Sequence, residues 1–130
     1  MKKSVICVLA VAVFLGAPAL RAEQPASPDE CVVQFFEASK SGDTVRMKQL
    51  MTGSFYNQRK TLIEQNPTYP DFLRKHYDGA HLQITNMREE PRGWVVEVRI
   101  KYADGTVDSN KFLVRKDASG IWKIIDEVHP

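Results

Sequence analysis

The spacing of apolar residues changes once along the chain, from a helical period to an alternating one. Between Ser27 and Gly79, apolar side chains recur every three or four residues in four stretches that Gly or Pro separate. From Ala80 onward they recur at every second position, which is typical of half-buried strands. Helices followed by a run of strands predict an α+β domain, with N-terminal helices packed on one face of an antiparallel meander sheet of about four strands.

The first helix has the clearest boundaries. Ser27 is its expected N-cap, Pro28 occupies the first turn and Glu30 completes a capping box. Gly42 suits a left-handed cap at its end. Three further helices are expected. The first starts at Asp43 and ends at Gly53, the second starts at Ser54 and ends at Pro67, and the third starts at Thr68 and ends at Asp78-Gly79. The expected inward positions of the four helices are Val32, Phe35, Phe36 and Ser39; Val45, Met47, Leu50 and Met51; Phe55, Tyr56, Leu62 and Ile63; and Phe72, Leu73 and Tyr77.

The first two strands follow residue 80. Leu82, Ile84 and Met87 mark the first strand. A turn at 91–93 leads into the second, in which apolar side chains alternate with polar ones over 94–102. The Asp104-Gly105 dipeptide then predicts a tight hairpin into the third strand.

The third and fourth strands are less regular. The third covers about 106–115, and its apolar parity slips between Val107 and Phe112, which predicts a bulge near Ser109-Asn110. A turn at 117–120 precedes the last strand, 121–128. Simple alternation along this strand predicts one face formed by Trp122, Ile124, Asp126 and Val128.

The first 22 residues have the pattern of a secretory signal peptide. Lys2 and Lys3 precede an uncharged apolar run of eleven residues, 5–15, which is shorter than the ~20 residues of a membrane-spanning helix. We expect cleavage after Ala19 or Ala22. Residues 23–27 would then be a flexible lead and residues 28–130 a single domain without a membrane span. The expected location is the bacterial periplasm or the exterior.

Loss of the signal peptide changes the charge of the chain. Three of its 18 Lys and Arg residues lie within residues 1–22, so 15 remain against 16 Asp and Glu. A nearly neutral exported domain is a poor candidate for nucleic-acid binding, which needs a positive face. Cys31 would be the only thiol left, so no internal disulfide is expected. Cys31 suits a buried apolar position, and a reactive thiol is the alternative.

Four short motifs resemble the nuclear-transport-factor-2-like (cystatin-like) superfamily, in particular its small exported bacterial members related to lumazine-binding proteins. The motifs are Ser27-Pro28-Asp29-Glu30, Phe35-Phe36-Glu37-Ala38, Lys40-Ser41-Gly42-Asp43 and Gly120-Ile121-Trp122-Lys123-Ile124. The resemblance covers about residues 27–128, although Thr52–Gly79 matches no pattern. It implies a curved, cone-shaped sheet around the helices, often with a conical pocket. The superfamily includes isomerases, dehydratases, ligand binders and secretion components, so the fold does not select a function.

Asp126 is the strongest candidate for catalysis. Its expected place beside Ile124 would surround a carboxylate with apolar groups, which raises a carboxyl pKa and suits general acid–base chemistry. Related ketosteroid-isomerase-like enzymes pair an acid with a tyrosine. A solvated or ion-paired Asp126 is the simpler alternative. His76 and His81 flank Asp78, but three such residues around one turn are too few to indicate a metal site.

The function predicted from the sequence is a non-catalytic exported domain that binds a small ligand or an envelope protein. The expected pocket-lining residues are Tyr56, Tyr77, Trp94, Tyr102 and Trp122. A small isomerase- or hydratase-like enzyme that uses Asp126 with a tyrosine is one alternative. A structural component of an envelope or secretion assembly is the other. No cofactor or metal is expected, and a homodimer is compatible with the sequence.

Overall fold

The computed structural model describes residues 23–129 of the chain. The predicted signal peptide, residues 1–22, therefore lies outside the described part. Within the described part, four helices precede a single antiparallel sheet whose four strands lie side by side in chain order, so the predicted α+β class and meander topology are confirmed. Within residues 23–129, no helix has the length and apolar character needed to cross a membrane.

Helix α2 (Pro28–Ser41) has the boundaries that the sequence predicts. The Ser27 hydroxyl oxygen accepts a hydrogen bond from the backbone N–H of Glu30 at 3.3 Å, which confirms the predicted N-cap. Gly42 has a φ of 70° and ends the helix in the left-handed conformation. Its backbone N–H donates to the carbonyl of Ser39, so the cap satisfies a carbonyl that the helix leaves without a partner.

The Ser27 cap should be measurable in the stability of the whole domain. Substitution of Ser27 by alanine is expected to lower the free energy of unfolding by about 1 kcal/mol, since the cap hydrogen bond to α2 is lost. Thr52 provides the matched control, because it precedes helix α4 (Gly53–Gln65) without a side-chain cap hydrogen bond. Thr52→Ala should change the urea midpoint much less than Ser27→Ala. Equal shifts for the two variants would show that the cap contributes nothing.

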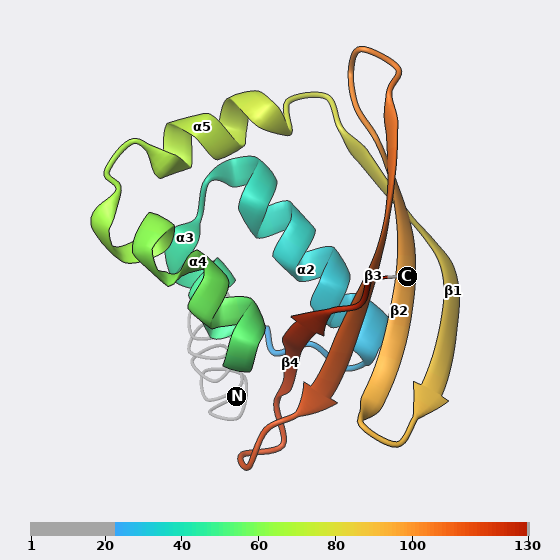
Figure 1. Cartoon of the computed structure of the whole chain (residues 1–130). Helices are drawn as coiled ribbons and strands as arrows, with labels where there is room; N and C mark the ends of the chain where they lie inside the picture. Colours follow the sequence, from blue (N-terminus) through green and yellow to red (C-terminus); the bar gives the residue numbers. More distant parts are fainter. Residues whose placement is uncertain (1–22, 130) are drawn as a thin grey trace, which may run out of the picture.

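The next three helices are short and line one side of the sheet. They are α3 (Thr44–Gln49), α4 (Gly53–Gln65) and α5 (Tyr69–His76). Asp43 caps α3 through the backbone N–H of Arg46 at 3.0 Å, as predicted. Figure 1 shows α5 across one end of the helical layer, close to the loop between β2 and β3.

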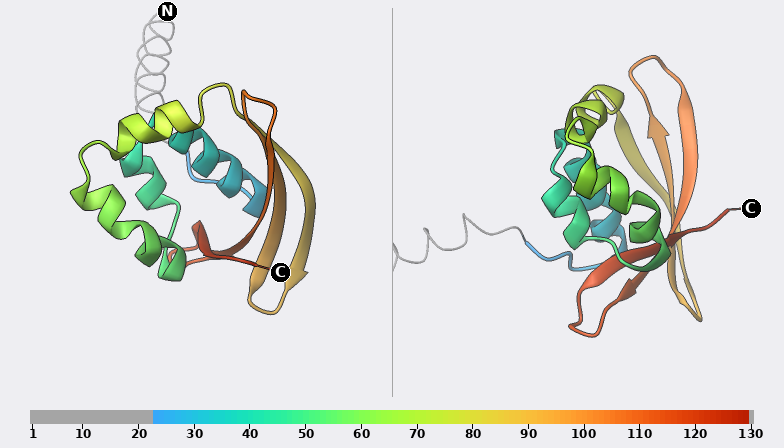
Figure 2. Two further views of the ribbon diagram at one scale, coloured as in Figure 1. Left: turned by 45° about the horizontal axis from the view of Figure 1, so that its top comes forward. Right: turned by 60° about the vertical axis from the view of Figure 1, so that its left-hand side comes forward.

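The strands are β1 (His81–Glu90), β2 (Gly93–Lys101), β3 (Val107–Lys116) and β4 (Trp122–Glu127). The sheet curves around the helices, which all lie on its concave side (Figure 2). The edge of β4 that faces away from β3 pairs with the segment before α4. Leu50 accepts from the backbone N–H of Ile124 at 2.9 Å, and Thr52 donates to the Ile124 carbonyl at 3.0 Å.

The core lies between the concave face of the sheet and the helices. Helix α2 is central to it, because it contacts all four strands as well as α3 and α5. The buried apolar residues of this core are Cys31, Val32, Phe36, Ala38, Met47, Leu50, Met51, Phe55, Leu73, Ala80, Val96, Val98, Ile100, Phe112, Val114 and Ile124. The even-numbered residues of β2 therefore form its inward face, as the alternation predicts.

Two bulges, one in β1 and one in β4, each reverse which alternate residues of the strand face the helices. In β1, Ile84 pairs with Val98 and Asn86 with Glu97, so Thr85 is an extra residue. This is why Ile84 and Met87, three positions apart, both pack against the core. In β4, Ile124 pairs with Val114 and Asp126 with Leu113, so Ile125 is the extra residue.

The bulge predicted near Ser109-Asn110 is wrong. The pairing of β2 with β3 is unbroken from Val107 to Val114. The parity slip has another cause: Val107 is 49% exposed on the outer face, while the inward positions before Phe112 are polar. The real irregularity lies one strand further along the chain.

Five details of the predicted helices are also corrected. Helix α3 ends at Gln49 rather than at Gly53, which is instead the first residue of α4. Ser54 lies within α4 rather than at its cap, and its hydroxyl donates to the Ile125 carbonyl at 3.2 Å. Val45 and Leu62 are exposed, since α3 and α4 bury only one side. Phe72 is 57% exposed because Leu73, one position further around α5, takes the inward place. Its ring stacks on Tyr69 and His76 instead.

Candidate functional site

A pocket of about 280 Å³ opens between the helices and the concave face of the sheet. We call it the concave pocket. Helices α2, α3, α4 and α5 provide one wall, and β2, β3 and the end of β4 provide the other. It is lined by Phe35, Ser39, Met47, Phe55, Arg59, Tyr69, Leu73, His76, Tyr77, Ile100, Tyr102, Asp108, Asn110, Phe112 and Glu127. Aromatic rings and a small set of polar groups thus meet in one cavity, as in many ligand sites.

Glu127 is the polar centre of the pocket. One of its carboxylate oxygens accepts from Arg59 Nη2 at 3.3 Å, and the other accepts from Asn110 Nδ2 at 2.9 Å. Arg59 also donates to the Phe55 carbonyl at 3.1 Å, and its guanidinium lies 3.7 Å from the centre of the Phe55 ring. The Arg59 and Glu127 side chains are only 24% and 19% exposed, so this ion pair is screened less than a surface pair.

The bulge at Ile125 brings Glu127 into the pocket. Without the extra residue, alternation from Ile124 would direct Asp126 inward and Glu127 outward. With it, Glu127 pairs with Phe112, an inward residue, while Asp126 pairs with Leu113. Leu113 in turn pairs with Val95, on the face of the sheet away from the helices. A single inserted position therefore decides which carboxylate serves the site.

The prediction that Asp126 faces the apolar side with Ile124 is therefore wrong. Its side chain is 34% exposed on the outer face, with Arg92 Nη2 at 3.8 Å. One of its oxygens accepts from the backbone N–H of Glu127 at 2.9 Å. Asp126 is the ion-paired carboxylate of the simpler alternative, and it does not belong to the concave pocket.

Three tyrosines line the mouth of the pocket. The Tyr77 and Tyr102 rings are stacked with centroids 6.1 Å apart, and His76 lies 4.7 Å from Tyr77 and 5.2 Å from Tyr102. Burial raises the pKa of Tyr69, Tyr77 and Tyr102, and for Tyr102 the neighbouring Tyr77 and Asp108 add to the effect. All three phenols consequently remain protonated and neutral well above neutral pH.

Two of the five predicted lining residues, Tyr77 and Tyr102, do line the concave pocket. Tyr56 is directed elsewhere on α4, and its hydroxyl donates to Glu64, which also pairs with Lys48 at 3.3 Å. Trp94 and Trp122 lie together at the opposite end of the sheet, beside Arg92 and Lys116. The structure does not bring these three residues to the pocket.

The polar residues of the pocket were not predicted from the sequence. Asp108 and Asn110 pair with Ile100 and Val98, so both occupy inward positions of β3. Counting back by twos from Phe112 would have found them. Arg59 carried no comparable signal, because the sequence of α4 does not show which of its polar residues contacts the sheet.

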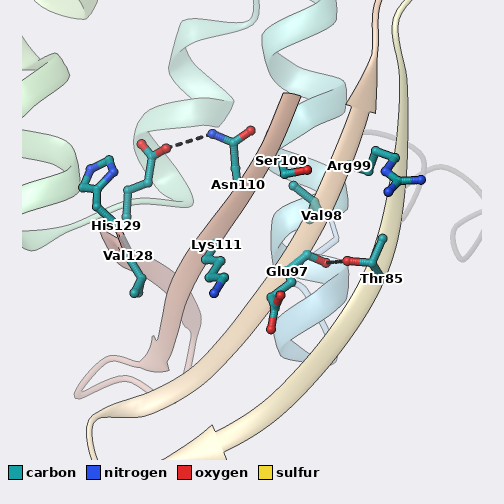
Figure 3. A pocket seen from close by; sticks show the side chains of 10 residues that line it. Thr85, Glu97, Val98, Arg99, Ser109, Asn110, Lys111, Val128 and His129 are labelled. Atoms are coloured by element: carbon teal, nitrogen blue, oxygen red, sulfur yellow. Dashed lines mark hydrogen bonds between the residues drawn. The ribbon is translucent and has the colours of Figure 1, made fainter. Parts of the chain in front are cut away.

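A second hollow of about 540 Å³ lies on the outer face of the sheet at the end of β4. Figure 3 shows Lys111 and Glu97 on this face, whereas Asn110 is directed toward the helices. The hollow reaches Asn110 and Glu127 from outside, but its only aromatic ring is that of His129. Glu97 forms an ion pair with Arg88 of the neighbouring strand, and Lys111 is its register partner on β3. It offers a ligand less surface for stacking than the concave pocket does.

Cys31 is buried at the centre of the fold. It is fully inaccessible, and its Sγ donates to the Trp122 carbonyl at 3.4 Å. Burial raises the pKa of the Cys31 thiol to about 12, against a smaller lowering effect of the Arg46 charge. The thiol is therefore protonated at neutral pH, which fits the buried apolar role rather than a reactive one.

We predict that iodoacetamide at pH 8 leaves Cys31 unmodified in the folded protein, because alkylation needs an accessible thiolate. Mass spectrometry of the peptide that contains Cys31 measures the modified fraction. The same treatment in 6 M guanidinium chloride provides the control and should alkylate Cys31 fully. Rapid alkylation without denaturant would contradict the buried assignment.

Within residues 23–129, no group of three or more His, Cys, Asp or Glu side chains converges as a metal site would require. His76 lines the concave pocket, while His81 borders a separate surface hollow beside α2. The two histidines that flank Asp78 therefore line two different hollows.

No family model matches this chain, and comparison with curated proteins and with solved structures found no similar protein. The geometry of the concave pocket is therefore the basis for the functional proposal.

Proposed function

We propose that the protein is an exported ligand-binding domain of the bacterial envelope, which holds a small molecule in the concave pocket without transforming it. The observation that carries this proposal is the pocket itself. It combines six Phe and Tyr rings with a few converging polar groups on a rigid sheet and helix scaffold. Its volume of about 280 Å³ suits a ligand of modest size.

The finer fold assignment, to the nuclear-transport-factor-2-like superfamily, belongs to the same proposal. Its support is the position of α2 along the concave face of a curved sheet, together with a pocket between the helices and that face. The motifs around Ser27, Gly42 and Trp122 add to it. Export to the periplasm rests on the pattern of residues 1–22.

The arrangement of Glu127 suits a structural part of the pocket wall rather than a general base. A general base needs a free oxygen within reach of the substrate proton. Both Glu127 oxygens already accept hydrogen bonds, from Arg59 and from Asn110. Asp126, the candidate of the enzyme alternative, lies on the other face of the sheet.

A fragment screen by ligand-observed NMR tests the proposal. We expect some small ring compounds to bind the purified protein, and Tyr77→Leu to weaken their binding at least fivefold. Tyr56→Leu is the matched control, since Tyr56 lies outside the concave pocket, and it should change affinity less than twofold. Absence of any binding fragment, or an equal effect of the two variants, would refute the proposal.

A further inference from the structure

The charges of the side chains that line the concave pocket do not sum to zero. Glu127 and Asp108 are both in the lining, whereas Arg59 is the only lining residue with a permanent positive charge. Arg59 is committed to the wall, because it bonds Glu127 and the Phe55 carbonyl. Asp108 therefore leaves the pocket with one negative charge in excess.

Asp108 lies at an exposed, inward position of β3, opposite Ile100. Among residues 23–129 it forms no ion pair, unlike Glu127. Its neighbour in the pocket is Tyr102, a neutral phenol. A carboxylate without a cationic partner, at the rim of an aromatic cavity, attracts cations and repels anions.

The aromatic rings supply the second half of the site. Phe35, Phe55 and Phe112 lie deep in the pocket, and Tyr69, Tyr77 and Tyr102 lie nearer to Asp108 and α5. The faces of such rings carry negative potential and attract cations, above all weakly hydrated ones. Arg59 shows this within the structure, because its guanidinium lies 3.7 Å from the centre of the Phe55 ring.

We infer that the ligand of the concave pocket is a small organic cation, of the quaternary ammonium or alkylated amine class. This inference rests on the proposed ligand-binding function and gives it a chemical class. The alkyl groups contact the half-buried rings of Tyr69, Tyr77 and Tyr102, and the positive charge is balanced by Asp108. An anionic ligand would face two carboxylates, while the one arginine is already engaged.

Choline and 3,3-dimethylbutan-1-ol test the inference, because they have nearly the same shape and differ in charge. Isothermal titration of the purified full chain should show choline binding at least tenfold more tightly than the neutral alcohol. Pivalate, an anion with the same branched group, should not bind measurably.

Two variants test whether Asp108 causes the preference for choline over the neutral alcohol. Asp108→Asn should weaken choline binding at least fivefold and leave the neutral alcohol unchanged. Glu89→Gln is the charge-matched control, since Glu89 is exposed at the far end of the sheet, and it should change choline affinity less than twofold. An equal loss in the two variants would overturn the role of Asp108.

The outcomes separate this inference from the proposed function. Fragments that bind in the pocket while choline does not, or binds no better than the neutral alcohol, would overturn the cation assignment and leave the binding function intact. If neither choline nor any fragment of the screen binds, both fail together.

Discussion

Replacing Phe55 with alanine should lower the free energy of unfolding by about 3–5 kcal/mol, the largest loss that we expect from one substitution. Phe55 is 1% exposed, and its ring packs edge-to-face against Phe35 at 5.4 Å and Phe112 at 5.8 Å. It also supports the Arg59 guanidinium. Its removal leaves a cavity where α2, α4 and β3 meet. Since small domains are stable by only about 5–15 kcal/mol, much of the stability would disappear.

Phe72→Ala is the control for this prediction. The same side chain is removed, but Phe72 is 57% exposed and contacts mainly Tyr69 and His76 on its own helix. We expect a loss of about 1 kcal/mol or less. Urea unfolding followed by tryptophan fluorescence measures both variants. Similar losses would mean that Phe55 is not the packed centre of the helix–sheet interface.

The second large effect concerns Glu127. Its replacement by alanine should cost about 2 kcal/mol of stability, because Arg59 and Asn110 lose their shared acceptor in a partly buried place. The adjacent variant Asp126→Ala should cost less than about 0.5 kcal/mol, since its pair with Arg92 is long and partly exposed.

Urea unfolding of the Glu127 and Asp126 variants also tests the bulge at Ile125. The expected order, a large loss for Glu127→Ala and a small one for Asp126→Ala, follows from which carboxylate faces the helices. The reverse order would mean that the strand alternates without the extra residue.

The elements of the fold could be predicted from the sequence because each carries a local signal. The Ser27 cap, the Gly42 terminator and the alternation of β2 depend on residues close together in the chain, and the structure confirms them. The order of the sheet follows from short connections, which leave an antiparallel meander as the simplest arrangement.

The site could be predicted only in part, because it depends on the register between strands. Tyr77 and Tyr102 belong to the set of aromatic residues expected to line a pocket, and the structure places both of them there. The choice between Asp126 and Glu127 depends on one extra residue, Ile125, whose presence no local pattern indicates. The alternation of apolar residues alone predicts a bulge near Ser109-Asn110, because the inward positions of β3 before Phe112 are the polar residues Asp108 and Asn110.

An NMR titration of the ¹⁵N-labelled protein with choline tests the central claim, a ligand site on the concave side, most directly. The account predicts that the Arg59 Nε–H signal and the Tyr77 and Tyr102 amides shift with one saturating dissociation constant. Shifts that gather instead on Lys111, Val128 and His129 of the outer hollow would contradict it, as would a spectrum that choline and the strongest fragments leave unchanged.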